Sequence, residues 1–243
     1  ENFSLSLKKG EIITIVGESG SGKSTVLSSI LGLLPNGGKI ISGDIIYNGN
    51  SMLSKSLNQW RELRGTEITM ISQDSGGTLN PIRKIGKQFV EYIQTHSKMS
   101  VKEAEEKAKD MFSKVNLPDP EIIMKSYPHQ LSGGMKQRVG IAMALTFHPR
   151  IILADEPTSA LDVITQAQIV KEIMDLRKKF DTSIIMVTHN LGVAAYISDK
   201  IIVMQNGKIV DAGNKNEVIE NPKSEYTKKL LEAVPEIGGE RLV

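Results

Sequence analysis

The stretch Gly17-Glu18-Ser19-Gly20-Ser21-Gly22-Lys23-Ser24-Thr25 fits the pattern G-x-x-x-x-G-K-[S/T], and the rest of the chain is interpreted around it. Loops with this pattern cradle the phosphates of a nucleotide. The glycines let backbone N–H groups turn toward an anion, Lys23 adds a positive charge for the outer phosphates, and Ser24 offers a hydroxyl to Mg2+. At average composition, a chance match in a chain this long has a probability on the order of 1%.

The residues on either side of this loop support the same interpretation. The apolar run Ile12–Val16 predicts a buried strand directly before the loop, and the pattern over residues 23–34 predicts a helix after it that ends at Pro35. This strand–loop–helix setting is what the motif requires, because the helix points its positive N-terminal end at the phosphates. A Gly- and Ser-rich loop without special chemistry is the weaker alternative.

Composition restricts the class of protein. The chain has 243 residues, of which 40% are hydrophobic and 24% charged, as in ordinary soluble proteins. The net charge of +2 is too small for a nucleic-acid footprint. The absence of cysteine excludes disulfides and iron–sulfur ligation and suits a reducing cytosol, and the four histidines are too scattered for a structural zinc site. No apolar run approaches the roughly 18 residues of a membrane span, so we expect any membrane role to be peripheral.

Strand and helix patterns alternate along the chain around one helical block. Alternation of this kind predicts an α/β fold with a mainly parallel sheet and helices on both faces. Strands are expected at 44–47, 67–71, 151–154, 183–187, 201–204 and 208–210, the last two as a hairpin around Asn206-Gly207. Helices are expected at 54–64, 132–147, 162–180, 215–219 and 224–234, with a short helix capped by Asn190.

Several local patterns carry further expectations. The alternation of Phe3, Leu5 and Leu7 with polar residues predicts a strand that begins mid-pattern, so we expect further sequence upstream. The segment 75–81 is expected to be a loop, and Gly238-Gly239 a loose end. Packing is favoured over base stacking for the single tryptophan, Trp60, and Ser100 with Glu103 predicts a capping box.

A second candidate site follows the predicted strand at 151–154. Asp155 and Glu156 stand at its end, where both carboxylates can reach the same edge of a sheet. In phosphate-loop ATPases an acidic residue at this position holds Mg2+. The neighbouring Glu156 could orient and deprotonate an attacking water. The alternative is a helix-capping acidic pair before Pro157, and the phosphate loop in the same chain weighs against it.

A third candidate is Leu131-Ser132-Gly133-Gly134-Met135-Lys136-Gln137-Arg138, which opens a predicted helix with a hydroxyl and two glycines. The N-terminus of such a helix is a second cradle for an anion. Taken alone, Ser-Gly-Gly before a helix would be a plain linker. One chain with two anion cradles, however, calls for an explanation.

The motifs together identify the family that the chain resembles. Leu-Ser-Gly-Gly-x-x-Gln-Arg at 131–138 resembles the signature motif of ATP-binding-cassette (ABC) ATPases. Gln73 after a strand resembles the Q-loop glutamine, Ser159-Ala160-Leu161-Asp162 the D-loop, and His189 the switch histidine. Singly, Gln73 and His189 would be ordinary surface or core residues. In this order the motifs are specific, and the resemblance covers essentially the whole chain.

The resemblance implies an architecture. It is a phosphate-loop (RecA-like) ATPase core with a mixed, mainly parallel sheet, a small antiparallel β subdomain and an inserted helical subdomain. The core would comprise residues 1–81 and 149–213, the helical insert with the signature 82–148, and a C-terminal helical extension 214–243.

The resemblance also implies a shared ATP site. Two such domains, identical or paralogous, would pair head to tail with ATP between the phosphate loop of one and the signature of the other. Glu156 would be the general base, His189 would contact the γ-phosphate and help to place the water, and Gln73 would complete the catalytic set. Mg2+ would be served by Ser24, Gln73 and Asp155. ATP would be bound by Gly17, Glu18, Ser19, Gly20, Ser21, Gly22, Lys23, Ser24, Thr25, Ser132, Gly133, Gly134 and Asp162.

Three further stretches resemble one subfamily, the ATPase subunits of bacterial oligopeptide, dipeptide and nickel importers. They are Thr78-Leu79-Asn80-Pro81, Tyr127-Pro128-His129-Gln130 and Tyr226-Thr227-Lys228-Lys229-Leu230-Leu231. Such a subunit would hydrolyse ATP at the cytoplasmic face of the cell membrane and drive a permease, whose coupling helix would contact residues 74–96. An extracytoplasmic solute-binding protein would be an indirect partner. Peptides are the favoured cargo, and nickel or a metallophore is the alternative.

Other classes fit less well. An ABC ATPase of DNA repair would carry long coiled coils before the signature, one of translation would join two cassettes, and the near-neutral charge speaks against nucleic acid. A non-hydrolysing cassette is disfavoured by the intact Glu156 and His189, and a phosphate-loop GTPase by the lack of Asn-Lys-x-Asp. The family's adenine-stacking aromatic would precede residue 1 and is unassigned. Without cysteine the chain cannot hold the iron–sulfur cluster of some subfamily members.

Overall fold

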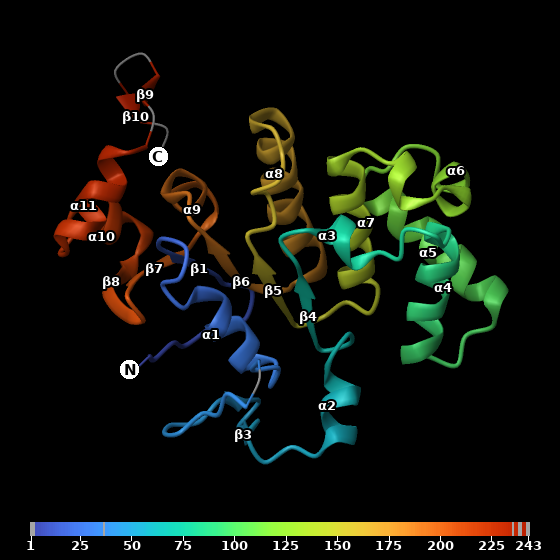
Figure 1. Cartoon of the computed structure of the whole chain (residues 1–243), viewed down its shortest axis with the longest axis horizontal. Helices are drawn as coiled ribbons and strands as arrows, with labels where there is room; N and C mark the ends of the chain where they lie inside the picture. Colours follow the sequence, from blue (N-terminus) through green and yellow to red (C-terminus); the bar gives the residue numbers. More distant parts are fainter. Residues whose placement is uncertain (1–2, 36, 235, 238–239, 242–243) are drawn as a thin grey trace. The chain divides into compact units, whose positions relative to one another are not determined.

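The chain folds as two units, each with strands of its own. One comprises Glu1–Trp60 with Ser183–Val243, and the other Arg61–Thr182. The computed structural model shown in Figure 1 describes residues 3–35, 37–234, 236–237 and 240–241. The loose end expected at Gly238-Gly239 lies outside the described residues.

The first unit is built on strand β1 (Ile12–Val16), whose five residues are all buried. It pairs in parallel with β6 (Ser183–Thr188) on one side and with β7 (Lys200–Gln205) on the other. The hairpin turn Asn206-Gly207 then returns the chain as β8 (Lys208–Asn214), antiparallel to β7. Every residue of β6 is buried too, as in parallel strands that are covered on both faces. The strands predicted at 12–16, 183–187, 201–204 and 208–210 and their mainly parallel pairing are therefore confirmed.

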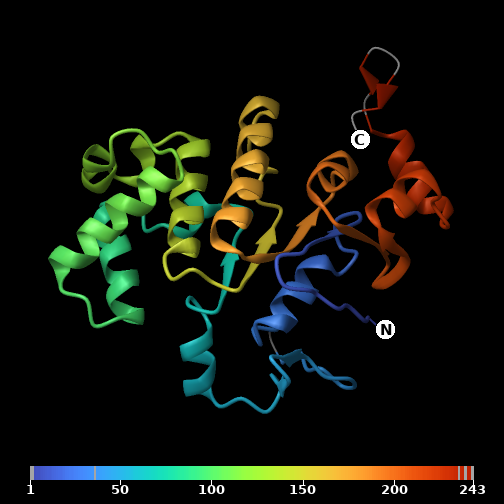
Figure 2. The ribbon, with the colours of Figure 1, turned by 180° about the vertical axis from the view of Figure 1, so that it is seen from behind.

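Four helices belong to the sheet of this unit: α1 (Lys23–Ile30), α9 (Leu191–Ile197), α10 (Lys215–Glu220) and α11 (Glu225–Glu232). Helix α9 packs on β1 and β6, and the two C-terminal helices pack on α9 and β8 (Figure 2). Their apolar side chains form one buried cluster: Val16, Leu191, Ala194, Ile201, Val203, Val218, Leu231 and Val234. Beyond it, β9 (Glu236–Ile237) and β10 (Glu240–Arg241) form a short antiparallel pair.

The prediction that Pro35 ends the first helix is wrong, because α1 already ends at Ile30. Gly32 adopts a left-handed φ of 62° directly after the helix. The N–H of Gly32 donates to the Ser29 carbonyl and that of Leu33 to the Ser28 carbonyl, which together make a Schellman cap. Gly32, two residues after the end of α1, thus stops the helix before Pro35 can do so.

The strand predicted from Phe3 to Lys8 is also wrong, because these residues, all described, form no strand. Lys8 shows the physical reason. Its N–H donates to the Glu11 carboxylate at 2.7 Å, and its carbonyl accepts from the Ser183 hydroxyl at 3.1 Å. Side chains therefore take the backbone hydrogen bonds that a neighbouring strand would otherwise make.

The expected small antiparallel part is present. Strands β2 (Ile46–Tyr47) and β3 (Asn50–Ser51) pair around the turn Asn48-Gly49, in which both residues have positive φ. After them comes α2 (Leu57–Leu63), which carries Trp60. The tryptophan is buried, and a Cβ added at Gly32 would lie 2.7 Å from its ring. The prediction that Trp60 serves packing is therefore confirmed.

The second unit contains one strand pair and most of the helices. Strands β4 (Ile68–Ile71) and β5 (Ile151–Asp155) are parallel neighbours. The helices α4 to α7 form the group at the right of Figure 1. With the long α8 and one 3-10 turn η1, their bounds are α4 Ile85–His96, α5 Val101–Lys114, α6 Pro120–Lys125, η1 Pro128–Gln130, α7 Gly133–Leu145 and α8 Val163–Phe180. The capping box of Ser100 and Glu103 is confirmed at α5.

The segment 75–81 departs from the predicted loop, because it contains the short helix α3 (Ser75–Thr78). Asp74 caps this helix by accepting the N–H of Gly77 at 2.8 Å. Ser75 is buried beside α7, where a Cβ added at Gly140 would lie 2.5 Å from its hydroxyl oxygen. The cap and this packing outweigh the poor helix propensity of the two glycines.

Among the described residues, no helix is both long enough and apolar enough to cross a membrane.

Candidate functional site

The phosphate loop begins directly after β1 and is held tightly at its first residue. Gly17 has a φ of 158°. A Cβ added there would lie 2.2 Å from the Met204 carbonyl oxygen of β7 and 2.9 Å from the Ser21 hydroxyl oxygen. Only glycine lets the loop pass this close to the neighbouring strand.

Lys23 places its ammonium group inside the loop. Its side chain is buried, and Nζ donates to the carbonyls of Gly17 at 2.7 Å and Glu18 at 2.8 Å. Ser21 is buried in the same loop, and its Oγ has no hydrogen-bond partner within the described part of the chain. Orphaned polar atoms of this kind are rare in folded proteins. A buried cation and a hydroxyl without a partner in one loop fit a polyanionic ligand such as a nucleoside triphosphate.

Ser24 and Thr25 follow in the first turn of α1, and both are exposed. Gly22 precedes the helix with a φ of 97° and serves as its N-cap without a side chain. This arrangement leaves the helix N-terminus open to an anion, and it leaves the Ser24 hydroxyl at the surface of the loop.

His189 stands at the same sheet edge as this loop. The register of β1 and β6 pairs Val16 with Thr188, so the next residues, Gly17 and His189, leave the two strands side by side. His189 is exposed, and Asn190 after it caps α9 by accepting the Val193 N–H at 3.2 Å. Ligands of α/β proteins bind at this carboxyl edge of parallel strands.

The second unit has a carboxyl edge of its own. The register of β4 and β5 pairs Ile71 with Ala154, so Gln73 and Glu156 both lie two residues beyond the paired ends of neighbouring strands. Asp155 is the last residue of β5. Gln73 is exposed, whereas Asp155 and Glu156 are half-buried. The three predicted residues of this unit are thereby brought to one edge.

Glu156 has an unusual backbone conformation for a residue with a side chain. Its φ is 42°, in the left-handed region, and its carbonyl accepts hydrogen bonds from the N–H of Ser159 at 3.2 Å and from the Ser159 hydroxyl at 3.1 Å. Conformations of this kind cost roughly 1–3 kcal/mol and gather at functional sites. The strained backbone of Glu156 therefore supports its candidacy as a functional residue.

The signature segment forms the N-terminus of α7. Ser132 is the N-cap, and its Oγ accepts the Met135 N–H at 3.2 Å. A Cβ added at Gly134 would lie 2.8 Å from a methyl group of Thr165 on α8. Ser132 and Gly133 are exposed. Glycine is thus required where the two helices approach, and the open first turn can receive an anion.

Asp162 has a visible structural role. It caps α8 and accepts hydrogen bonds from the Thr165 N–H at 3.0 Å and the Thr165 hydroxyl at 2.7 Å. These two hydrogen bonds lower the pKa of the Asp162 carboxyl. Contact of Asp162 with nucleotide stays a prediction.

Mg2+ would have few protein ligands. Within the residues that the structure describes, no group of three or more potential ligands (His, Asp or Glu) could hold a metal ion. Magnesium in phosphate-transfer sites is bound by one or two protein oxygens, together with phosphate and water. The hydroxyl of Ser24 in the first unit and the carboxylate of Asp155 in the second are each, taken singly, oxygen ligands of the kind that Mg2+ prefers.

Two contacts were not predicted. Arg138, the last residue of the signature, pairs with Glu172 of α8 at 2.8 Å, and the hydroxyl of Tyr226 contacts Glu18 in the phosphate loop. The motif around Arg138 marked its position, but only the packing of α7 on α8 shows the partner. No local pattern connects Tyr226 with the loop, because the two residues are 208 positions apart.

The family follows from comparison with known proteins. Residues 1–159 match the model of the ABC transporter family. The chain belongs to this family. As an ABC ATPase it has relatives named for peptide transport. It is 44% identical over 231 residues to the probable peptide ABC transporter ATP-binding protein y4tR of Sinorhizobium fredii, covering 95% of this chain and 69% of the relative.

Two further relatives extend the range of names. The oligopeptide transport ATP-binding protein OppD of Bacillus subtilis is 45% identical over 230 residues, covering 94% of this ABC ATPase and 64% of that protein. The metal-staphylopine import system ATP-binding protein CntD of Staphylococcus aureus is 42% identical over 231 residues, covering 95% and 84%. The chain thus spans about two thirds of the length of the peptide-transport relatives.

Solved structures of other cassettes share the fold of this ABC ATPase. One is cbiO1 of Clostridium perfringens, with a TM-score of 0.77 and 27% identity over 91% of this chain and 84% of that one. Another is the cassette MJ0796, described as a dimer in a post-hydrolysis state bound to ADP and Pi, with a TM-score of 0.76 and 30% identity over 88% and 90%. The phosphate-loop ATPase fold expected from the motifs is therefore confirmed.

Proposed function

We propose that this ABC ATPase is the ATP-hydrolysing subunit of a bacterial importer for peptides, located at the cytoplasmic face of the membrane. The observation that carries the proposal is the loop at 17–25, in which the buried Lys23 ammonium and the Ser21 hydroxyl without a partner suit a polyanionic ligand. The names of the relatives from Sinorhizobium fredii and Bacillus subtilis support peptides as cargo. The CntD relative supports import of a metal–metallophore complex as the second candidate.

The catalytic roles follow from the chemistry of each side chain. The phosphate loop with Lys23 would hold the phosphates, and the carboxylate of Glu156 would take a proton from water as its oxygen attacks the γ-phosphorus. The bond from that phosphorus to the bridging oxygen breaks, and ADP and phosphate leave. His189 would contact the γ-phosphate, and Gln73 would help to place the water. Ser24 and Asp155 would hold Mg2+, which would supply charge neutralisation for this reaction.

A second cassette would complete the site. Ser132, Gly133 and Gly134 form an open, largely exposed helix N-terminus in α7. We propose that it contacts the nucleotide held by the phosphate loop of a partner cassette, identical or paralogous. The dimeric MJ0796 cassette supports this arrangement.

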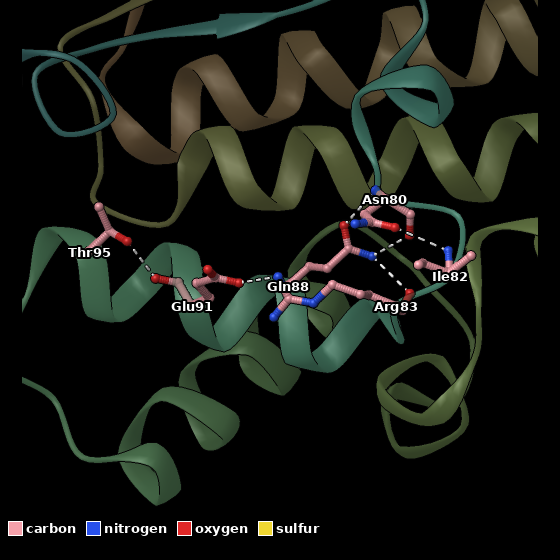
Figure 3. A network of polar contacts seen from close by, with 6 residues as sticks. All are labelled: Asn80, Ile82, Arg83, Gln88, Glu91 and Thr95. Atoms are coloured by element: carbon pink, nitrogen blue, oxygen red, sulfur yellow. Dashed lines mark hydrogen bonds and ion pairs between the residues drawn. The ribbon is translucent and has the colours of Figure 1, made fainter.

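The permease would contact the surface around α4. A pocket of about 450 Å³ lies there, lined by Arg83, Lys87, Val90, Glu91, Gln94, Thr95 and Val101. The loop of residues 80–83, which precedes α4, is held by a network of hydrogen bonds, which Figure 3 shows. Gln88 accepts the Asn80 N–H at 2.8 Å and donates to the carbonyls of Asn80 at 3.1 Å and Arg83 at 2.9 Å.

This loop displays an apolar side chain for a partner. Ile82 is 82% exposed, and its N–H donates to the Asn80 side chain at 3.1 Å. Arg83 pairs with Glu91 of α4 at 2.5 Å. A rigid loop with one exposed apolar side chain, flanked by paired charges, suits the end of a permease helix, with Ile82 as the apolar anchor.

Growth of the source bacterium tests the proposal. A strain without the gene is complemented with the wild-type chain or with Glu156→Gln and is grown on a peptide as the only source of an essential amino acid. The proposal predicts growth with the wild type alone and equal growth of all strains on the free amino acid. Normal growth of the deletion strain on peptides, combined with a defect under metal limitation, would instead favour metallophore import.

A further inference from the structure

The stretch Tyr226–Leu231, which in the sequence marks only a subfamily resemblance, includes a residue that contacts the phosphate loop. Tyr226 lies in the first turn of α11, and its hydroxyl oxygen accepts a hydrogen bond from the backbone N–H of Glu18 at 2.9 Å. Glu18 is the second residue of the loop. A C-terminal helix therefore reaches the residues proposed to bind ATP.

The start of α11 is fixed to the sheet. Asp211 of β8 is 5% exposed, and its Oδ2 accepts the N–H groups of Lys223 at 2.8 Å and Ser224 at 3.3 Å. Ser224 in turn caps the helix. On the buried side of α11, Leu231 packs in the same apolar cluster as Val16, the residue before the loop. Helix α11, which carries Tyr226, is thus anchored at its start by Asp211 and on its buried side by the apolar cluster.

The peptide group that joins Gly17 to Glu18 is held on two sides. Its N–H, that of Glu18, donates to the Tyr226 hydroxyl at 2.9 Å, while its carbonyl, that of Gly17, accepts from Lys23 Nζ at 2.7 Å. Glu18 is otherwise exposed. Without the tyrosine hydroxyl, its N–H would bond to water and the peptide plane could rotate. Rotation would displace the Gly17 carbonyl, which shares this peptide plane and orients the Lys23 ammonium.

We propose that Tyr226 is a positioning residue for the phosphate loop, through which the C-terminal helix α11 sets the affinity for nucleotide. The inference rests on the proposed function, because it assigns Tyr226 a part in binding the same ATP. It acts through Glu18 and Lys23 and touches no phosphate itself. Loss of one neutral hydrogen bond changes an equilibrium by about 0.5–1.5 kcal/mol, which corresponds to roughly two- to tenfold in affinity.

The test compares the full chain with its Tyr226→Phe variant, which keeps the ring and removes only the hydroxyl. Calorimetry with MgATP measures Kd, NMR measures hydrogen exchange of the Glu18 amide, and thermal unfolding without nucleotide measures stability. Tyr196→Phe is the matched control, because Tyr196 is 59% exposed on α9 of the same unit. We expect Tyr226→Phe to raise Kd about two- to tenfold and to speed exchange at Glu18, with KM for ATP rising and kcat within about twofold. The thermal midpoint should match that of Tyr196→Phe.

Three outcomes separate the possibilities. An unchanged Kd with unchanged exchange at Glu18 would overturn the inference. So would a lower thermal midpoint without nucleotide at unchanged Kd, because Tyr226 would then serve stability alone. If the wild-type chain itself does not bind MgATP, the proposed function fails, and that result is distinct from equal binding by both proteins.

Discussion

Arg138 at the end of the signature and Glu172 in the middle of α8 form a bidentate ion pair. Nε and Nη2 of the arginine lie 2.8–3.2 Å from the two carboxylate oxygens, and the side chains are only 17% and 14% exposed. The pair connects α7, which begins after its N-cap Ser132, with α8, which begins after its N-cap Asp162. The signature and the D-loop segment are thereby connected within the second unit.

Removing one partner of this pair should destabilise the protein. Glu172→Ala leaves a mostly buried guanidinium without its carboxylate, which costs about 3 kcal/mol of unfolding free energy. Urea unfolding measures this loss. Glu225→Ala, which removes an exposed pair with Lys228, should cost much less, because solvent screens an exposed pair. The double variant Arg138→Met with Glu172→Leu, which replaces both charges by apolar side chains, should recover the stability that Glu172→Ala loses. A loss no larger than that of Glu225→Ala would contradict the role given to the pair.

Glu156→Gln should stop hydrolysis and spare ATP binding. The amide has nearly the same shape as the carboxylate but cannot accept the proton of the attacking water, so kcat should fall by a factor on the order of 100 or more. ATP should then accumulate in a trapped dimer, visible by size-exclusion chromatography. Glu220→Gln, an exposed residue of α10, serves as the control and should behave as wild type. Hydrolysis at the wild-type rate in Glu156→Gln would exclude it as the general base.

Lys23→Ala should abolish tight nucleotide binding. The substitution removes the buried ammonium that the loop holds through the carbonyls of Gly17 and Glu18. We expect Kd for MgATP to rise by a factor on the order of 100, because charge-assisted hydrogen bonds to phosphate are lost. Fluorescence titration measures Kd, and Lys39→Ala, at an exposed position, is the matched control. An affinity equal to that of the control would refute the role of Lys23.

Ser132→Arg should separate ATP binding from hydrolysis. A long charged side chain at this exposed N-cap would block the approach of a partner cassette, while the phosphate loop stays intact. Hydrolysis should be lost, and Kd of the monomer for ATP should be unchanged. The variant also loses its N-cap, worth about 1 kcal/mol, so Ser100→Ala at α5 is the control for cap loss alone. Full hydrolysis in Ser132→Arg would disprove the shared site.

Stability should fall as the solution becomes mildly acidic. Burial lowers the pKa of both His96 and His148 below the ordinary value, so the folded state binds fewer protons than the unfolded state below about pH 6.5. The stability present above that pH is lost as the pH falls through the folded pKa values. Urea unfolding at pH 7.5 and 5.5 measures the difference, and His96→Gln should reduce it. An equal or larger pH dependence in His96→Gln would assign the effect to other groups.

Long buried runs and strong caps made much of the fold predictable. Ile12–Val16 and Ser183–Thr188 are mostly apolar and are buried over their whole length, and these strands formed where expected. The errors lie where a few tertiary or local contacts decide. Gly32 ends α1 early, Asp74 starts an unexpected helix, and the Lys8 backbone bonds to side chains. None of these contacts leaves a periodic pattern in the sequence, so the sequence alone does not predict them.

The candidate site was predictable as residue types and order, but not as geometry. The motifs named Glu156, and only the fold shows its left-handed backbone. They named Lys23, and only the fold shows which carbonyls hold it. The catalytic and binding roles stay predictions, as does the division into a core of 1–81 and 149–213, an insert of 82–148 and an extension of 214–243. Experiments on single residues decide the roles.

The grip of Lys23 on two loop carbonyls has one more consequence. A ligand has to draw the ammonium away from oxygens that already satisfy it, so a weakly charged anion gains little by entering. Phosphate chains carry enough negative charge to compensate for both lost bonds, whereas chloride or a single carboxylate does not. If the loop binds nucleotide as proposed, it would also act as a charge threshold that keeps the abundant small anions of a cell from competing with the nucleotide.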